Sequence, residues 1–201
     1  MFEPLTGYTT GIEGVEELSK LSVGVVCSRM LAEMLWRIGV GTVRYVGDFI
    51  SPQDVYRDVS LSLDDASNYD VLHSKGNTLV ISALAESLDV DFFTRALRGC
   101  DVIIAHRYCH TASKAAERLG ALFMPCLVSS VLPEDLKRED VVKAMKKVEE
   151  YRPENPMCYA MLCSAQVLEL LRMCSGDRIL IAPEAMIPSE KPPFFENIKI
   201  W

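Results

Sequence analysis

The sequence has no basic excess, no long apolar run and no compact cysteine motif, and each absence excludes a class of protein. Lysine and arginine number 21 against 28 acidic residues, so the net charge is −7. Such a charge argues against general nucleic-acid binding, which needs a basic face to meet phosphates. No apolar run reaches the roughly 18 residues of a membrane-spanning helix, and the N-terminus lacks the pattern of a signal peptide. We therefore expect a soluble cytoplasmic protein, with residues 1–201 forming a single domain.

The cysteines do not form a recognisable disulfide or zinc pattern. There are seven, an odd number, they stand among apolar neighbours, and no CxxC occurs. The sequence therefore predicts buried free thiols and no metal site.

One stretch near the N-terminus predicts a strand, a helix and a second strand. The apolar, β-branched run 21–26 has strand length. Ser28 is suited to cap the start of a helix, and Gly39 and Gly41 are suited to end it. The run 42–46 is then a second strand. A unit of this length closes as a right-handed parallel crossover, and nucleotides usually bind where such strands end.

The rest of the chain continues to alternate helices and strands. Further helices are predicted at 14–18, 91–97, 111–119, 133–149 and 157–174, and further strands at 78–82, 101–105, 121–128, 178–181 and 195–200. The segments 58–77 and 183–193 are expected to be mostly loop; the second contains Glu184, Met186 and Lys191 and would form a lid or pack on the surface. This order predicts an α/β protein with a Rossmann-like sheet, parallel in its first half, with antiparallel C-terminal strands and helices on both faces.

Two distant stretches share a resemblance to one known family. The first reads LSVGVVCSRMLAEMLWRIGVGTVRYVGDFISPQDVYR, and the second reads NPMCYAMLCSAQVLELLRMCSGDRILI. The first resembles the opening of the ubiquitin-activating-enzyme-like superfamily, which includes the ThiF/MoeB-like bacterial adenylyltransferases for thiamine and molybdopterin sulfur carriers. The second resembles a late helix and strand of the same domain, with Gln166-Val167-Leu168-Glu169 in place of a Gln-Ala-Leu-Glu-like run.

The resemblance implies ATP and Mg²⁺ as cofactors and a set of nucleotide-binding residues. Arg57, in Asp54-Val55-Tyr56-Arg57, matches the family's phosphate-binding arginine and is the expected catalytic residue. Asp48, Ser28 and Lys75 are the further candidates for contact with ATP. The alternatives are structural: a surface ion pair for Arg57, a turn cap for Asp48, a helix N-cap for Ser28 and a solvated loop position for Lys75.

The chain also departs from the family pattern. The glycine-rich phosphate loop is replaced by Val23-Gly24-Val25-Val26-Cys27-Ser28. The usual Mg²⁺-binding aspartate is replaced by a segment that contains His106, Arg107 and His110. These three follow a buried strand and are expected to bind an anionic substrate; the alternative is a solvated helix N-terminus. Cys27 and Cys109 would lie near the same crevice and are expected to be structural.

Two functions follow from the resemblance. The first is ATP-dependent adenylation of a small-molecule carboxylate, as in the superfamily branch that adenylates guanylylpyridinol during assembly of the Fe-hydrogenase cofactor. The alternative is a catalytically inactive member that serves as a binding or dimer partner in a sulfur-carrier or ubiquitin-like activation system. A nicotinamide-dependent reductase is disfavoured because the dinucleotide fingerprint is missing. The resemblance also implies a homodimer, for which the apolar helix 157–174 would supply part of the interface.

Overall fold

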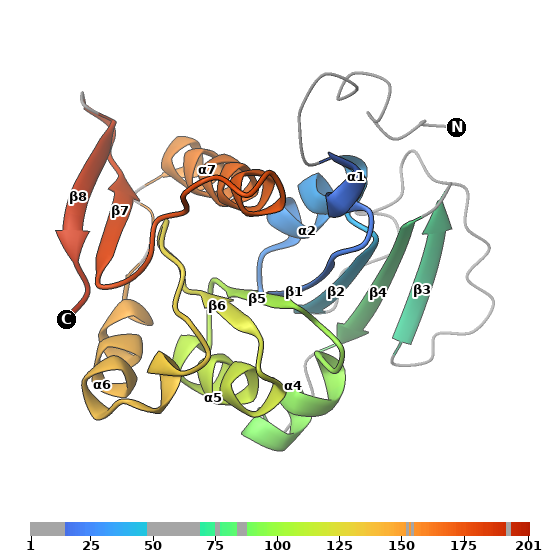
Figure 1. Cartoon of the computed structure of the whole chain (residues 1–201), viewed down its shortest axis with the longest axis horizontal. Coiled ribbons are helices and arrows are strands. Elements are labelled where there is room, and N and C mark those ends of the chain that lie inside the picture. Colours follow the sequence, from blue (N-terminus) through green and yellow to red (C-terminus); the bar gives the residue numbers. More distant parts are fainter. Residues whose placement is uncertain are drawn as a thin grey trace.

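The computed structural model describes residues 15–47, 69–74, 77–83, 88–151, 153, 155–191 and 194–201. Within them a six-stranded sheet has the order β3-β4-β2-β1-β5-β6 (Figure 1). Five of these strands run parallel, and β3 joins the edge antiparallel to β4. The strands are β1 Ser22–Val26, β2 Thr42–Gly47, β3 Tyr69–Ser74, β4 Asn77–Ala83, β5 Val102–Ala105 and β6 Leu122–Met124.

Near the C-terminus a separate two-stranded antiparallel sheet is formed by β7 (Glu184–Pro188) and β8 (Phe195–Lys199). It is joined to the segment after β6 by backbone hydrogen bonds between Val128 and Met186. The predicted fold class is confirmed: a Rossmann-like α/β sheet with antiparallel C-terminal strands.

Helices cover both faces of the large sheet. Figure 1 shows α1, α2 and α7 over one face and α4, α5 and α6 over the other. The helices are α1 Val15–Leu18, α2 Arg29–Arg37, α4 Val90–Ala96, α5 Cys109–Leu119, α6 Glu139–Val148 and α7 Pro156–Cys174. Along β1, Val23 and Val25 belong to the apolar cluster of α2 and α7, whereas Val26 belongs to that of α4 and α5. The alternation of side chains along a strand thus supplies two cores from one apolar run.

Two expected elements are shorter than their sequence pattern. The strand predicted over 121–128 ends at Met124, because Pro125 has no N–H to donate to a neighbouring strand. The helix predicted over 133–149 is divided at Arg138, whose extended backbone separates a turn of 3₁₀ helix (Asp135–Lys137) from α6.

Three other predictions differ from the structure. The segment 58–77, expected to be mostly loop, contains β3, while 58–68 and 75–76 lie outside the described residues. The loop expected over 183–193 contains β7. In the second case Pro183 and Pro188 flank the strand or end it, so they do not interrupt its interior. The strand expected over 178–181 is reduced to a single bridge between Ile181 and Ser130.

One helix among the described residues, α7, is long and apolar enough to cross a membrane by length and composition. Its buried residues include Leu162, Cys163, Val167 and Leu170, which pack in the two cores. The core helix of a soluble protein passes the same test of length and composition, and 39% of this apolar window is buried inside the protein.

Candidate functional site

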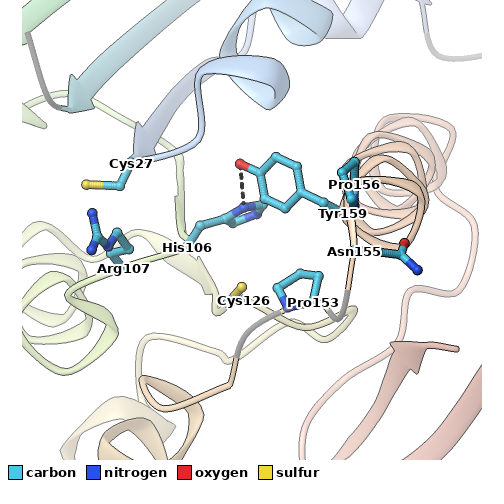
Figure 2. Close-up of a pocket in the computed structure, with 8 residues that line it drawn as sticks. All are labelled: Cys27, His106, Arg107, Cys126, Pro153, Asn155, Pro156 and Tyr159. Atoms are coloured by element: carbon cyan, nitrogen blue, oxygen red, sulfur yellow. Dashed lines mark hydrogen bonds between the residues drawn. The ribbon is translucent and has the colours of Figure 1, made fainter.

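A pocket lies where the order of the parallel strands reverses. The chain leaves β1 through α2 to reach β2 on one side, and it later enters β5 on the other side of β1. Ligands of doubly wound α/β proteins bind at the carboxyl ends of strands at such a switch point. A pocket of about 570 Å³ lies there (Figure 2). The lining residues come from the turns after β1, β5 and β6 and from the start of α7: Cys27, His106, Arg107, Cys126, Pro153, Asn155, Pro156 and Tyr159.

The turn after β1 has only Cys27 and Ser28 before α2 begins. Cys27 has a left-handed backbone, with φ of 57°, and its N–H donates to the carbonyl of Val46 at 2.7 Å. Ser28 occupies the N-cap position, but its hydroxyl makes no capping bond. Instead Ser28 Oγ lies 2.6 Å from the phenol oxygen of Tyr159 and 3.8 Å from Cys163 Sγ. The predicted helix start is confirmed, whereas the predicted use of the hydroxyl as a cap is wrong.

His106, the first residue after β5, is buried and neutral. Its Nε2 lies 2.7 Å from Gln166 Oε1, and Gln166 Nε2 donates to the carbonyls of Pro125 and Leu127 at 2.9 and 3.1 Å. Because those carbonyls only accept, the amide oxygen must face His106, and His106 Nε2 must carry the proton. Burial lowers the pKa of His106 to about 4, against the smaller opposing effect of the hydrogen bond that His106 donates to Gln166.

The tautomer of His106 determines which neighbouring groups donate and which accept hydrogen bonds. His106 Nδ1 is left as an acceptor, 3.3 Å from the hydroxyl of Tyr159, and the two rings meet edge to face with centroids 5.4 Å apart (Figure 2). Tyr159 therefore donates to His106 and accepts from Ser28. Burial raises the pKa of Tyr159 to about 12. We call this set of Ser28, Tyr159, His106 and Gln166 the polar chain; it is uncharged at neutral pH and spans from α2 to the segment after β6.

Arg107 and Asn155 lie on different sides of the pocket (Figure 2). Arg107 follows His106 and is exposed. Asn155 caps α7, because its Oδ1 accepts from the N–H of Cys158 at 2.9 Å. Its amide group donates to Glu190 in the turn between β7 and β8. The segment 183–193, expected to be a lid or a surface loop, thus reaches the rim of the pocket through Glu190.

The structure brings together some of the residues predicted from sequence. His106 and Arg107 line the pocket, and Ser28 lies behind Tyr159. His110 is not among the described lining residues: its backbone N–H donates to Oε2 of Glu149, the residue after α6, at 3.4 Å. The pKa of His110 is lowered by burial and by Lys114 and Lys146. The other candidates, Asp48, Arg57 and Lys75, lie outside the described residues.

Sequence reasoning missed Tyr159 and Gln166 as site residues. Both are polar residues of a largely apolar helix, and they are seven positions apart. Such spacing places two side chains on one helix face, and that pattern was the available signal. Cys109, expected to be structural, is buried and donates its thiol to the carbonyl of Ala105 at 3.2 Å.

The described pocket does not offer the ligands that Mg²⁺ prefers. None of its described lining residues is a carboxylate, and no group of three or more metal-binding side chains occurs in the described part of the chain. Cys27, in the turn after β1, is one of the residues that line the pocket.

Comparisons with known proteins support the fold and go no further. No protein-family model matches the chain, and no curated protein matches it. Among solved structures, the chain is similar to the crystal structure of selenomethionine PaaA, with a TM-score of 0.59 at 13% sequence identity. The match covers 93% of this chain and 66% of the PaaA chain, so this chain spans less than two thirds of that protein. At this identity the likeness shows a shared α/β architecture alone.

Proposed function

We propose that the chain is a short member of the ubiquitin-activating-enzyme-like superfamily that adenylates a small-molecule carboxylate with ATP. The single observation that supports this most directly is the switch-point pocket, whose described lining includes the guanidinium of Arg107 and the uncharged side chains of His106 and Tyr159. The sequence resemblance adds the reaction type. It also supplies guanylylpyridinol as the particular acceptor. The cytoplasm is the proposed location because the sequence has no long apolar run and no signal-peptide pattern.

Adenylation joins the carboxylate to the α-phosphate of ATP. A carboxylate oxygen attacks the α-phosphorus, the bond to the pyrophosphate oxygen breaks, and an acyl adenylate and pyrophosphate result. Arg107 would hold the carboxylate by charge-assisted hydrogen bonds. Tyr159 and His106 exclude water from one wall without adding charge. Arg57, Asp48 and Lys75 are the residues proposed to meet ATP, on the resemblance alone, and Mg²⁺ would neutralise phosphate charge there.

Calorimetric titration with MgATP tests this proposal, with wild type compared with Arg57→Ala. We expect micromolar binding that the substitution weakens about tenfold or more, as the loss of a charged hydrogen-bond donor implies. A screen of carboxylates for pyrophosphate release should then identify the acceptor class. Absence of heat at millimolar ATP would exclude adenylation.

A second candidate function is a binding partner without catalysis. Cys27 favours it, because a non-glycine residue holds the left-handed position of the turn after β1, and its side chain occupies the pocket wall. Met157 and Leu168 are exposed apolar side chains of α7 and support the proposed homodimer. Light scattering that returns the mass of one chain would exclude that dimer.

A further inference from the structure

The adjoining sides of α5 and α6 bring three basic side chains together, none of which belongs to the described lining of the pocket. The two helices pack against each other, and the N–H of His110 donates to Glu149 Oε2 at 3.4 Å, which joins the start of α5 to the end of α6. Lys114 follows His110 by four positions, so both side chains lie on one face of α5. Lys146 is in the last turn of α6. We call His110, Lys114 and Lys146 the basic cluster.

The members of the basic cluster are close enough to act on one another electrostatically. Burial makes the largest contribution to the lowered pKa of His110, and Lys114 and Lys146 lower that pKa further. Glu149 faces the same ring and raises the pKa by less than either lysine lowers it. The folded structure therefore disfavours the charged form of His110, and an anion held between these groups would favour it.

The two lysines of the basic cluster form no ion pair with any residue that the structure describes. By contrast, Arg118 of α5 is paired with Asp91, and Lys143 of α6 is paired with Glu139. Carboxylates are not scarce, because the chain has 28 acidic residues against 21 lysines and arginines. Unpaired lysines beside a histidine are therefore a specific feature of this surface, and their charge is available to a ligand.

The ring of His110 also has a free donor. Its Nδ1 is buried and has no hydrogen-bond partner in the described part of the chain. A buried N–H without an acceptor is rarer than an acceptor without a donor, so the proton of the neutral ring lies on Nε2. Nε2 makes no hydrogen bond with a described residue and is not one of the buried unpartnered atoms. Its N–H is therefore open to a ligand at the surface.

We propose that the basic cluster binds an anion of the phosphate class, either the free ion or the end group of a phosphorylated molecule. A tetrahedral oxyanion has several acceptor oxygens, so it can accept from two ammonium groups and one imidazole N–H on two helices at once. A carboxylate has two oxygens in one plane and meets fewer of these donors. The proposal makes no use of adenylation, so its test is independent of the proposed function.

Titration of the full chain with sulfate, followed by NMR of the histidine rings, tests the site. Sulfate keeps its charge over the whole range in which histidine titrates, so a change of pH acts on the protein alone. Sulfate should raise the pKa of His110 by stabilising the charged ring, and should leave His106, bonded to Gln166 in the interior, unchanged. Sodium chloride at equal ionic strength is the reference, because salt alone screens the lysines. By linkage, sulfate should bind more tightly as the pH falls and His110 takes up a proton.

Three lysine variants localise the effect. Lys146→Gln and Lys114→Gln should each weaken sulfate binding about three- to fivefold, as the loss of one exposed charge implies. The double variant should abolish the sulfate-induced rise in the pKa of His110. Lys143→Gln, on α6 but paired with Glu139, is the matched control and should leave sulfate binding unchanged. All three lysines are exposed, so a melting temperature is a sufficient check of folding.

The outcomes are distinct from those of the MgATP titration. A His110 that responds equally to sulfate and chloride, or a control variant that weakens sulfate binding as much as Lys146→Gln, overturns the proposal. Glycerol phosphate separates the two sources of the anion. If it binds as tightly as inorganic phosphate, the site takes a phosphorylated molecule; if it binds more weakly, the site takes the free ion. A sulfate-specific response of His110 without any heat from MgATP supports the anion site and excludes adenylation, and the reverse pair of results has the opposite meaning.

Discussion

Ser28 Oγ lies 2.6 Å from the phenol oxygen of Tyr159, and this contact joins the start of α2 to the first turn of α7 across 131 positions of sequence. The same phenol donates to His106, so one hydroxyl connects three elements around the pocket. Ser28 is fully buried. The hydrogen bond between Ser28 and Tyr159 is therefore structural. Ser28 could contact a ligand directly only if this hydrogen bond broke.

Loss of the Tyr159 hydroxyl should destabilise the fold through both partners. Tyr159→Phe leaves the ring but removes the donor to His106 and the acceptor for Ser28, so we expect a loss of about 1–2 kcal/mol in the free energy of unfolding. Ser28→Ala should cost about 1 kcal/mol. Urea unfolding of the double variant should show a cost about 1 kcal/mol smaller than the sum. Strict additivity would mean that the two hydroxyls do not interact.

The neutral state of His106 predicts a loss of stability in acid. Its folded pKa is lowered to about 4, whereas the unfolded value is 6.5. Between these values the unfolded chain binds more protons than the folded chain. The stability of the fold with neutral His106 is therefore fully present above pH 6.5 and is lost as the pH falls toward 4. The full effect is about 3 kcal/mol. Urea midpoints of wild type and His106→Asn across this range check it: the difference between the two should shrink in acid, and parallel curves would contradict it.

The sequence predicted the part of the fold that local patterns determine. The apolar run 21–26 and the helix stop at Gly39 gave the first crossover, and the structure has both, with Gly39 at φ of 97°. The division of the helix at Arg138 and the strand at Glu184–Pro188 were not foreseen. The strand β7 depends on distant partners: it pairs with β8 and with Val128, and local propensity does not indicate those contacts.

The sequence predicted only part of the candidate site, because the residues that it missed come from a distant helix. His106 and Arg107 follow a strand directly, so topology alone placed them. Tyr159 lines the pocket and Gln166 contacts His106 behind it; both come from α7, 53 and 60 residues after His106 in the chain. The run Gln166–Glu169 was singled out in the sequence only by its resemblance to a family pattern. The structure shows what its two polar residues contact. Gln166 fixes His106 and the segment after β6, and Glu169 accepts from the N–H of Leu180 at 2.7 Å.

Gln166 is predicted to be the most sensitive member of the polar chain. Gln166→Leu keeps the volume but removes the acceptor for His106 Nε2 and the donor to the carbonyls of Pro125 and Leu127, of which only that of Pro125 keeps another donor, the N–H of Leu127, so we expect a loss of roughly 3 kcal/mol or more. Ser164→Ala, on the exposed side of the same helix, is the control and should change stability by less than about 0.5 kcal/mol. Equal unfolding midpoints for the two variants would contradict the assigned role of Gln166.

Two glycines should differ in their tolerance of alanine. A Cβ at Gly41 would lie 2.0 Å from the backbone oxygen of Ser19, whereas a Cβ at Gly24 would lie 2.7 Å from Cδ2 of the Leu97 side chain. A leucine side chain can shift, but a backbone oxygen fixed between elements cannot do so easily. Gly24→Ala should therefore cost about 1–3 kcal/mol, and Gly41→Ala should cost more. Thermal unfolding that ranks the two in the reverse order would contradict this reason.

Asn155 should stabilise the start of α7 chiefly as a cap. Asn155→Ala removes both the acceptor for the Cys158 N–H and the bond to Glu190, and we expect a loss of about 1 kcal/mol in the free energy of unfolding. Asn155→Ser keeps a capping oxygen but is too short to reach Glu190. Because the bond to Glu190 is exposed and the cap is partly buried, the serine variant should recover most of the loss, as measured by urea unfolding. If serine were as damaging as alanine, the bond to Glu190 would carry the effect, and the turn between β7 and β8 would stabilise the rim of the pocket.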